Sequence, residues 1–97
     1  MTTYFVTRHS GAVEWARRQG IAAEAVSHLD VETVKSGDTV LGTLPVNLVA
    51  EINRRGARYL HLRLDVPLQH RGQELTVEDM ETFGARFEEF EVKRIGQ

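Results

Sequence analysis

The sequence Thr3-Tyr4-Phe5-Val6-Thr7-Arg8-His9-Ser10-Gly11-Ala12 contains the first strand-to-helix turn expected in this chain. Its residues Tyr4-Phe5-Val6 are aromatic and β-branched, which is typical of a short strand buried on both faces of a parallel sheet. A helix is expected from about Ala12 to Gln19, and Gly20 is placed to end it. The residues between the two elements should therefore lie at the carboxyl end of a strand.

Thr7-Arg8-His9-Ser10-Gly11 brings a cation, an imidazole and a hydroxyl to this turn. A helix N-terminus offers unpaired N–H groups and a partial positive charge to an anion. Arg8 is suited to clamping a phosphate, and His9 to proton transfer or hydrogen bonding, although both can also be solvated loop residues. Ser10 is expected to be a helix N-cap, since no nucleophile elbow supports a catalytic serine.

Further elements are expected along the chain. Ala23 to Leu29 is a weak strand, and Thr39 to Thr43 is a stronger one that runs into Leu44-Pro45-Val46-Asn47. Proline is favoured in the first turn of a helix, so a second helix should begin there and end at Gly56. Its expected apolar side comprises Val46, Leu48, Val49 and Ile52.

The last third of the chain predicts two strands and a helix. From Tyr59 to Leu64, leucines alternate with polar or aromatic residues. The leucines should lie on one face of a strand, and Tyr59, His61 and Arg63 should form a half-exposed or interface face. Thr76 and Asp79 have the spacing of a capping box, so a third helix should begin at Thr76. Its expected buried stripe is Val77, Met80, Phe83 and Phe87, and Phe90 to Ile95 should form the last strand.

The order β-α-β-β-α-β-α-β predicts one α/β domain, residues 1–97, with an open and mostly parallel sheet. Ligands of such sheets bind beyond the carboxyl ends of the strands. The turn from Gly42 to Asn47 should therefore lie beside the turn that follows the first strand. In this second turn Gly42 permits close backbone approach, Thr43 can cap the helix and Asn47 can reach a base edge or a phosphate. Equally, Gly42 can pack against a helix and Asn47 can be a surface residue.

Two other residues have both a functional and an ordinary interpretation. Trp15 could stack on a nucleobase, although an aromatic residue at helical spacing is more often part of a core. Arg71, beside Gly72 in the loop before Thr76, could be a mobile cation that closes over a ligand.

Composition excludes several classes of protein. The net charge of −2 and the pI of about 6.1 argue against a general binder of duplex nucleic acid. The dinucleotide and phosphate-loop motifs are absent, as are cysteines, and the four histidines lack the spacing of a zinc helix, so neither a cofactor nor a metal is expected. With no apolar membrane-spanning stretch and no leader pattern, we expect a soluble cytoplasmic protein that does not bind membranes.

Four blocks of the sequence, residues 4–16, 42–48, 56–62 and 71–75, resemble a small type III CRISPR-associated family, the sixteenth Csx family. The similarity runs nearly end to end. A proline is common in that family where this chain has Ser10, which weakens Ser10 as a catalytic hydroxyl. The resemblance implies a Rossmann-like fold related to the CARF nucleotide sensors, in a homodimer or a higher homo-oligomer.

The resemblance also implies a function. Such a protein would bind a cyclic oligoadenylate, most readily cyclic tetra-adenylate, across a two-fold axis. It would cleave the ring by metal-independent attack of a ribose 2′-OH and so switch off type III antiviral signalling. Arg8 and His9 would be catalytic, and the ligand would be held by Thr7, Ser10, Gly11, Trp15, Gly42, Thr43, Leu44, Pro45, Asn47 and Arg71. The alternatives are a sponge or sensor that binds without cleaving, and a structural partner module of a CRISPR complex.

Overall fold

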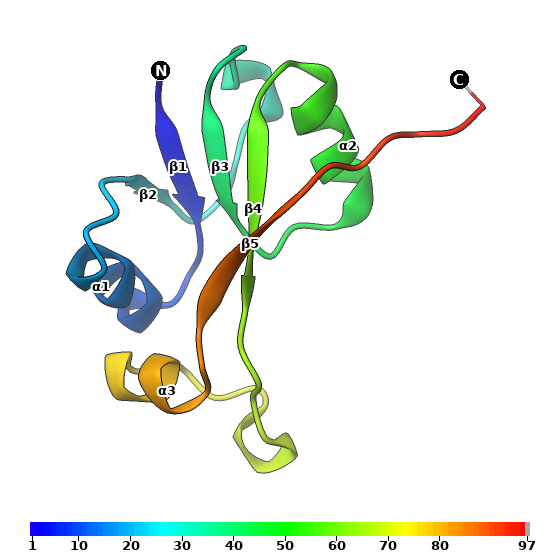
Figure 1. Cartoon of the computed structure of the whole chain (residues 1–97). Coiled ribbons are helices and arrows are strands. Elements are labelled where there is room, and N and C mark those ends of the chain that lie inside the picture. The colour runs from blue at the N-terminus through cyan, green and yellow to red at the C-terminus, as the bar shows by residue number, and fades with distance from the viewer. Residues whose placement is uncertain (97) are drawn as a thin grey trace.

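A computed structural model of the protein describes residues 1–96 (Figure 1). The strands are β1 (Thr3–Val6), β2 (Glu24–Val26), β3 (Thr39–Gly42), β4 (Arg58–Arg63) and β5 (Arg86–Phe90). The helices are α1 (Ser10–Arg18), α2 (Val46–Arg54) and α3 (Val77–Thr82), with short 3-10 helices η1 (Val31–Thr33) and η2 (Leu68–His70).

The strands form one five-stranded sheet in the order β2-β1-β3-β4-β5. Neighbouring strands from β2 to β4 are parallel, with Phe5 paired to Ala25 on one side and Leu41 on the other, whereas β5 is antiparallel to β4. The prediction of a mostly parallel α/β sheet is thus confirmed. The sheet is mixed because its edge strand β5 is antiparallel. Because the chain leaves β1 toward β2 and leaves β3 toward β4, the connections diverge between β1 and β3, the position where open α/β sheets bind ligands.

Both faces of the sheet are covered, and each has its own core. On one face α1 and α3 pack together over buried Phe5, Ala12, Trp15, Ala16, Leu41, Leu62 and Met80 (Figure 1). On the other face α2 and the segment around η1 cover Leu29, Val34, Val40, Val49, Ile52, Ala57 and Tyr59. The loop that carries η2 lies between β4 and α3, beyond the carboxyl end of β4.

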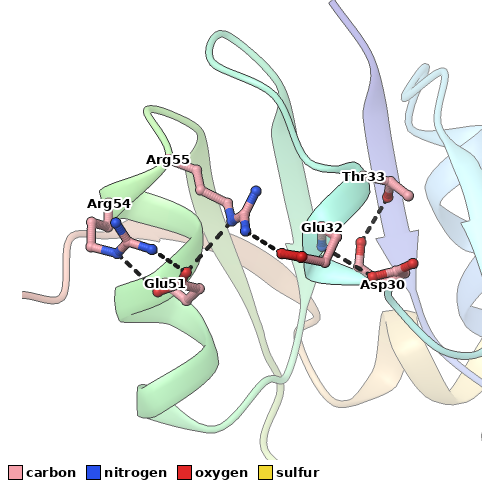
Figure 2. Close-up of polar contacts among 6 residues, drawn as sticks. All are labelled: Asp30, Glu32, Thr33, Glu51, Arg54 and Arg55. Atoms are coloured by element: carbon pink, nitrogen blue, oxygen red, sulfur yellow. Dashed lines mark hydrogen bonds and ion pairs between the residues drawn. The ribbon is translucent and has the colours of Figure 1, made fainter.

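A polar network joins η1 to the end of α2, on the face of the sheet that these two elements cover (Figure 2). The Arg55 guanidinium lies 2.6 Å from a Glu32 carboxylate oxygen and 3.6 Å from a Glu51 oxygen, so it links the two elements. The side chain of Asp30 caps η1 by accepting a hydrogen bond from the Glu32 N–H at 3.0 Å.

The predicted starts of two helices need correction. Helix α1 begins at Ser10, so the cap position belongs to His9, and Ser10 is not the N-cap. Helix α2 begins at Val46 with Pro45 at the cap position, so Thr43 does not cap it. Val46 is 71% exposed and does not belong to the buried side of α2, whose buried residues are Val49 and Ile52. The capping box of Thr76 and Asp79 at the start of α3 is confirmed.

The C-terminal assignment also differs from the prediction. Helix α3 ends at Thr82, before Gly84 with its positive φ of 68°, and Phe87 belongs to β5 rather than to a helical stripe. Phe83 and Phe87 have helical spacing in sequence, so the start of the strand was assigned to the helix. The last strand is accordingly Arg86–Phe90 and not 90–95. Tyr59 is 1% exposed under α2, so its face of β4 is buried at that end.

Candidate functional site

A cleft of about 630 Å³ lies at the carboxyl end of β1 and β4. Three segments surround it: the turn after β1, the residues that follow β4, and the loop from η2 to α3. Its lining consists of Arg8, His9, Leu64, Val66, His70, Arg71, Gly72, Gln73, Glu74 and Leu75. The lining combines the apolar residues Leu64, Val66 and Leu75 with two arginines and two histidines.

The loop that precedes α3 is held against the start of α1 by close backbone packing. A Cβ atom on Gly11 would overlap the Leu75 carbonyl oxygen and would lie 2.8 Å from the Thr76 Cα. The Thr76 hydroxyl accepts a hydrogen bond from the Asp79 N–H at 3.1 Å, and the Asp79 carboxylate accepts one from the Thr76 N–H at 3.0 Å. These contacts fix the wall of the cleft, so Gly11 shapes the site through its lack of a side chain.

The two arginines of the cleft differ from most arginines of the chain. The arginines that lie within ion-pair distance of a carboxylate are Arg17, Arg18, Arg54, Arg55, Arg58, Arg63 and Arg86. Within residues 1–96, neither Arg8 nor Arg71 has such a partner. Both are exposed at the cleft, and the only carboxylate in the lining is that of Glu74, which accepts a long 3.5 Å hydrogen bond from the Ser10 hydroxyl. The cleft therefore offers unneutralised positive charge to an anion.

The turn after β1 leaves the first turn of α1 open. His9 occupies the cap position with extended backbone (φ −95°, ψ 113°) and makes no side-chain capping hydrogen bond. Thr7 shapes this turn, since its hydroxyl accepts the His9 N–H at 3.2 Å and its own N–H donates to the Val26 carbonyl at 2.9 Å. The positive end of α1 thus faces the region that Arg8 and His9 line.

His70 is a lining residue that the sequence did not single out. Its ring packs edge-on against Phe83, with the centroids 5.2 Å apart. Its Nδ1 atom is buried and has no hydrogen-bond partner among the described residues. The only signal in the sequence was its position next to Arg71, in the loop before the capping box.

Trp15 does not belong to the site. The side chain is 4% exposed and packs in the core, with its ring centroid 5.6 Å from that of Phe87. A base could stack on it only by displacing core residues. The core interpretation of Trp15 is therefore confirmed, and burial leaves its ring without a face for a ligand in this structure.

The second predicted turn is only partly beside the first. Gly42 does lie next to β1, since a Cβ there would be 3.1 Å from the Val6 carbonyl oxygen, so its small size serves strand packing. The chain then turns toward α2, and the residues 42–45, which include Thr43, Leu44 and Pro45, are not part of the lining of the cationic cleft. Asn47 lines a different cleft of about 1170 Å³, between α2 and residues 91–94.

A buried hydrogen-bond group closes the turn after β3. The Tyr59 hydroxyl accepts the Leu44 N–H at 2.8 Å and lies 3.0 Å from the Gly42 carbonyl oxygen and 2.7 Å from the His61 Nδ1. Burial raises the pKa of Tyr59 above its ordinary value. These contacts assign Tyr59 and His61 to the support of this turn.

Among the described residues there is no group of three or more histidine, aspartate or glutamate side chains placed to hold a metal ion. None of the helices in residues 1–96 is both long and apolar enough to cross a bilayer.

Fold and cleft together define a small mixed α/β protein with a cationic cleft beyond the carboxyl ends of its strands. Residues 4–93 match the family described as "Putative CRISPR-associated protein (Cas_VVA1548)", and the chain belongs to this family. No curated protein and no solved structure matches the chain.

Proposed function

We propose that this protein binds and cleaves a cyclic oligoadenylate, with cyclic tetra-adenylate as the first candidate, and thereby ends type III CRISPR signalling. The observation that carries the proposal is the pair Arg8 and Arg71, which approach one cleft from two separate segments without carboxylate partners in residues 1–96. The cleft also holds His9 at the open end of α1. Membership of a CRISPR-associated family supports the same reading.

The proposed reaction is an internal transfer at one phosphodiester of the ring. The ribose 2′-OH attacks its own 3′-phosphate, so a bond forms between O2′ and phosphorus and the bond from phosphorus to O5′ breaks. The 2′-OH proton passes to a base, and O5′ receives a proton from an acid; His9 serves one of these two roles. Arg8, Arg71 and the first N–H groups of α1 stabilise the charge that develops on the phosphoryl oxygens. The product is linear with a 2′,3′-cyclic phosphate.

The proposal includes a CARF-like, Rossmann-like sensor architecture and a homodimer. A cyclic ligand with two-fold symmetry suits an isologous pair of identical clefts, each supplying one Arg8 and one Arg71. Analytical ultracentrifugation with and without cyclic tetra-adenylate tests this part independently of cleavage.

The direct test is incubation of the purified protein with cyclic oligoadenylates of four and of six units, followed by chromatography and mass spectrometry. We expect linear products that end in a 2′,3′-cyclic phosphate. Intact ligand after many molar equivalents, with binding detected by calorimetry, would identify a sponge or sensor instead. Absence of both binding and cleavage would reject the proposed ligand.

A further inference from the structure

We propose that His70 binds a phosphoryl oxygen in the cleft by donating a hydrogen bond from Nε2–H. The inference rests on the proposed function for the identity of the ligand, and it adds a residue and a role that the family match does not assign. It makes His70 a ligand-binding partner of Arg8 and Arg71, on the opposite loop from His9.

The imidazole ring of His70 is fixed on one side by packing and burial. One edge contacts Phe83, and the Nδ1 atom is buried without a hydrogen-bond partner in residues 1–96. The backbone is held as well, since the His70 N–H donates to the Pro67 carbonyl at 2.9 Å. With Nδ1 enclosed, Nε2 is the ring nitrogen that a molecule in the cleft can reach.

The position of the ring proton follows from this burial. A buried N–H without an acceptor is rarer and more costly than a buried acceptor without a donor. Imidazole carries its single proton on one nitrogen or the other. The proton therefore belongs on Nε2, where it points to the cleft, and the buried Nδ1 keeps its lone pair.

The groups around the ring set the charge that a ligand would meet. The charged and titratable groups that share the cleft with His70 are Arg8, His9, Arg71 and Glu74, and Phe83 closes the other side. An Nε2–H donor beside two unpaired guanidinium groups suits an anion with several oxygens, such as a phosphoryl group. Glu74 is an acceptor that a bound anion would avoid, so the phosphoryl group should lie toward the arginine side.

The test compares two substitutions that keep different parts of the ring. The amide nitrogen of a glutamine can take the place of Nε2, whereas that of an asparagine takes the place of Nδ1. Using adenosine 5′-monophosphate as the probe in an NMR titration, we expect His70→Asn to weaken binding about tenfold or more and His70→Gln to retain most of it. His28→Gln, at an exposed histidine outside the cleft, is the matched control and should bind as the wild type does.

A second readout needs no variant. Long-range ¹H–¹⁵N spectra of the wild-type protein should assign the His70 proton to Nε2, and adding the nucleotide should shift that proton. Equal binding by His70→Asn and the wild type, equal losses in both His70 variants, or a proton on Nδ1 would each overturn the inference. If the nucleotide binds through His70 but cyclic tetra-adenylate does not bind, the inference stands and the proposed function fails.

Discussion

The backbone of Gly11 in α1 packs directly against the carbonyl of Leu75, so closely that no side chain fits between them. This contact joins the first turn of α1, which carries the open helix end, to the loop that supplies His70 and Arg71. The contact therefore sets how closely two of the segments around the cationic cleft approach each other. Gly11 thus has a structural role, while the expectation that it binds the ligand stays a prediction.

Gly11→Ala should destabilise the protein by roughly 1–3 kcal/mol, because the new methyl group must push the loop away from α1. In an ordinary helix the same change stabilises by up to about 1 kcal/mol, so the sign of the effect is informative. Urea unfolding followed by circular dichroism measures it. Ser10→Ala, at the exposed neighbouring position, should be nearly neutral, and a stabilised Gly11→Ala protein would contradict the packing.

Arg8→Ala should weaken both the binding and the cleavage of cyclic tetra-adenylate, since in the proposed mechanism the guanidinium contacts the phosphate before and during the reaction. A loss of about tenfold or more in affinity is expected for a charge-assisted contact. Calorimetry and single-turnover cleavage measure the two effects. Arg17→Ala removes an exposed arginine that is already paired with Glu14, so it serves as the control and should change neither.

His9→Ala should lower the single-turnover rate about 10²- to 10⁴-fold while the affinity changes little, as expected for an acid or base. In the proposed mechanism the ring nitrogen acts on a proton in the transition state, whereas Arg8 and Arg71 are proposed to hold the ligand. Rate against pH, measured for the wild type and the variant, should lose one limb in the variant. An unchanged rate would remove His9 from the chemistry.

The sequence predicted the alternation of helices and strands well, because local signals mark it: the aromatic strand before Arg8, Gly20 and Gly56 at helix ends, and the Thr76 capping box. It missed features that depend on contacts between distant segments. The helical spacing of Phe83 and Phe87 placed the last strand too late in the sequence, because the bounds of β5 are set by its pairing with β4.

The residues of the candidate site were likewise predicted only where the local sequence marks them. Arg8, His9 and Arg71 were predicted, and they line one cleft. The grouping of Asn47 with them failed because the chain crosses from the sheet edge to the α2 layer after Gly42, which a parallel order alone does not reveal. His70 was missed since its enclosure by Phe83 is a tertiary contact.

Asp38→Asn should lower the thermal midpoint by about 5 °C or more. The buried carboxylate accepts the backbone N–H groups of Thr2 and Lys35, both at 2.9 Å, and so ties β1 to the turn before β3. The backbone hydrogen bond from Thr2, followed by that from Lys35, lowers the pKa of Asp38. Asp65→Asn, at an 84% exposed side chain, is the matched control.

The lowered pKa of Asp38 makes its contribution to stability depend on pH. Since the folded pKa lies below the unfolded one, its stabilisation is complete above the unfolded value of about 3.9 and is lost as the pH falls toward the folded pKa. The difference in stability between wild type and Asp38→Asn should therefore narrow on acidification. A difference that stays constant from pH 7 to pH 3 would show that the carboxylate charge is not responsible.

Tyr59→Phe should destabilise the protein by about 1–3 kcal/mol, because it leaves the half-buried Leu44 N–H without its acceptor, the hydroxyl of the buried Tyr59. Burial raises the pKa of Tyr59, so its contribution is complete below the unfolded value of about 10 and is lost as the pH rises through the folded pKa. The difference between wild type and variant in urea unfolding should accordingly narrow as the pH rises above about 10. Tyr4→Phe, which removes a hydroxyl without a hydrogen bond in residues 1–96, should cost much less; equal losses in the two variants would mean that the hydroxyl network does not support the turn after β3.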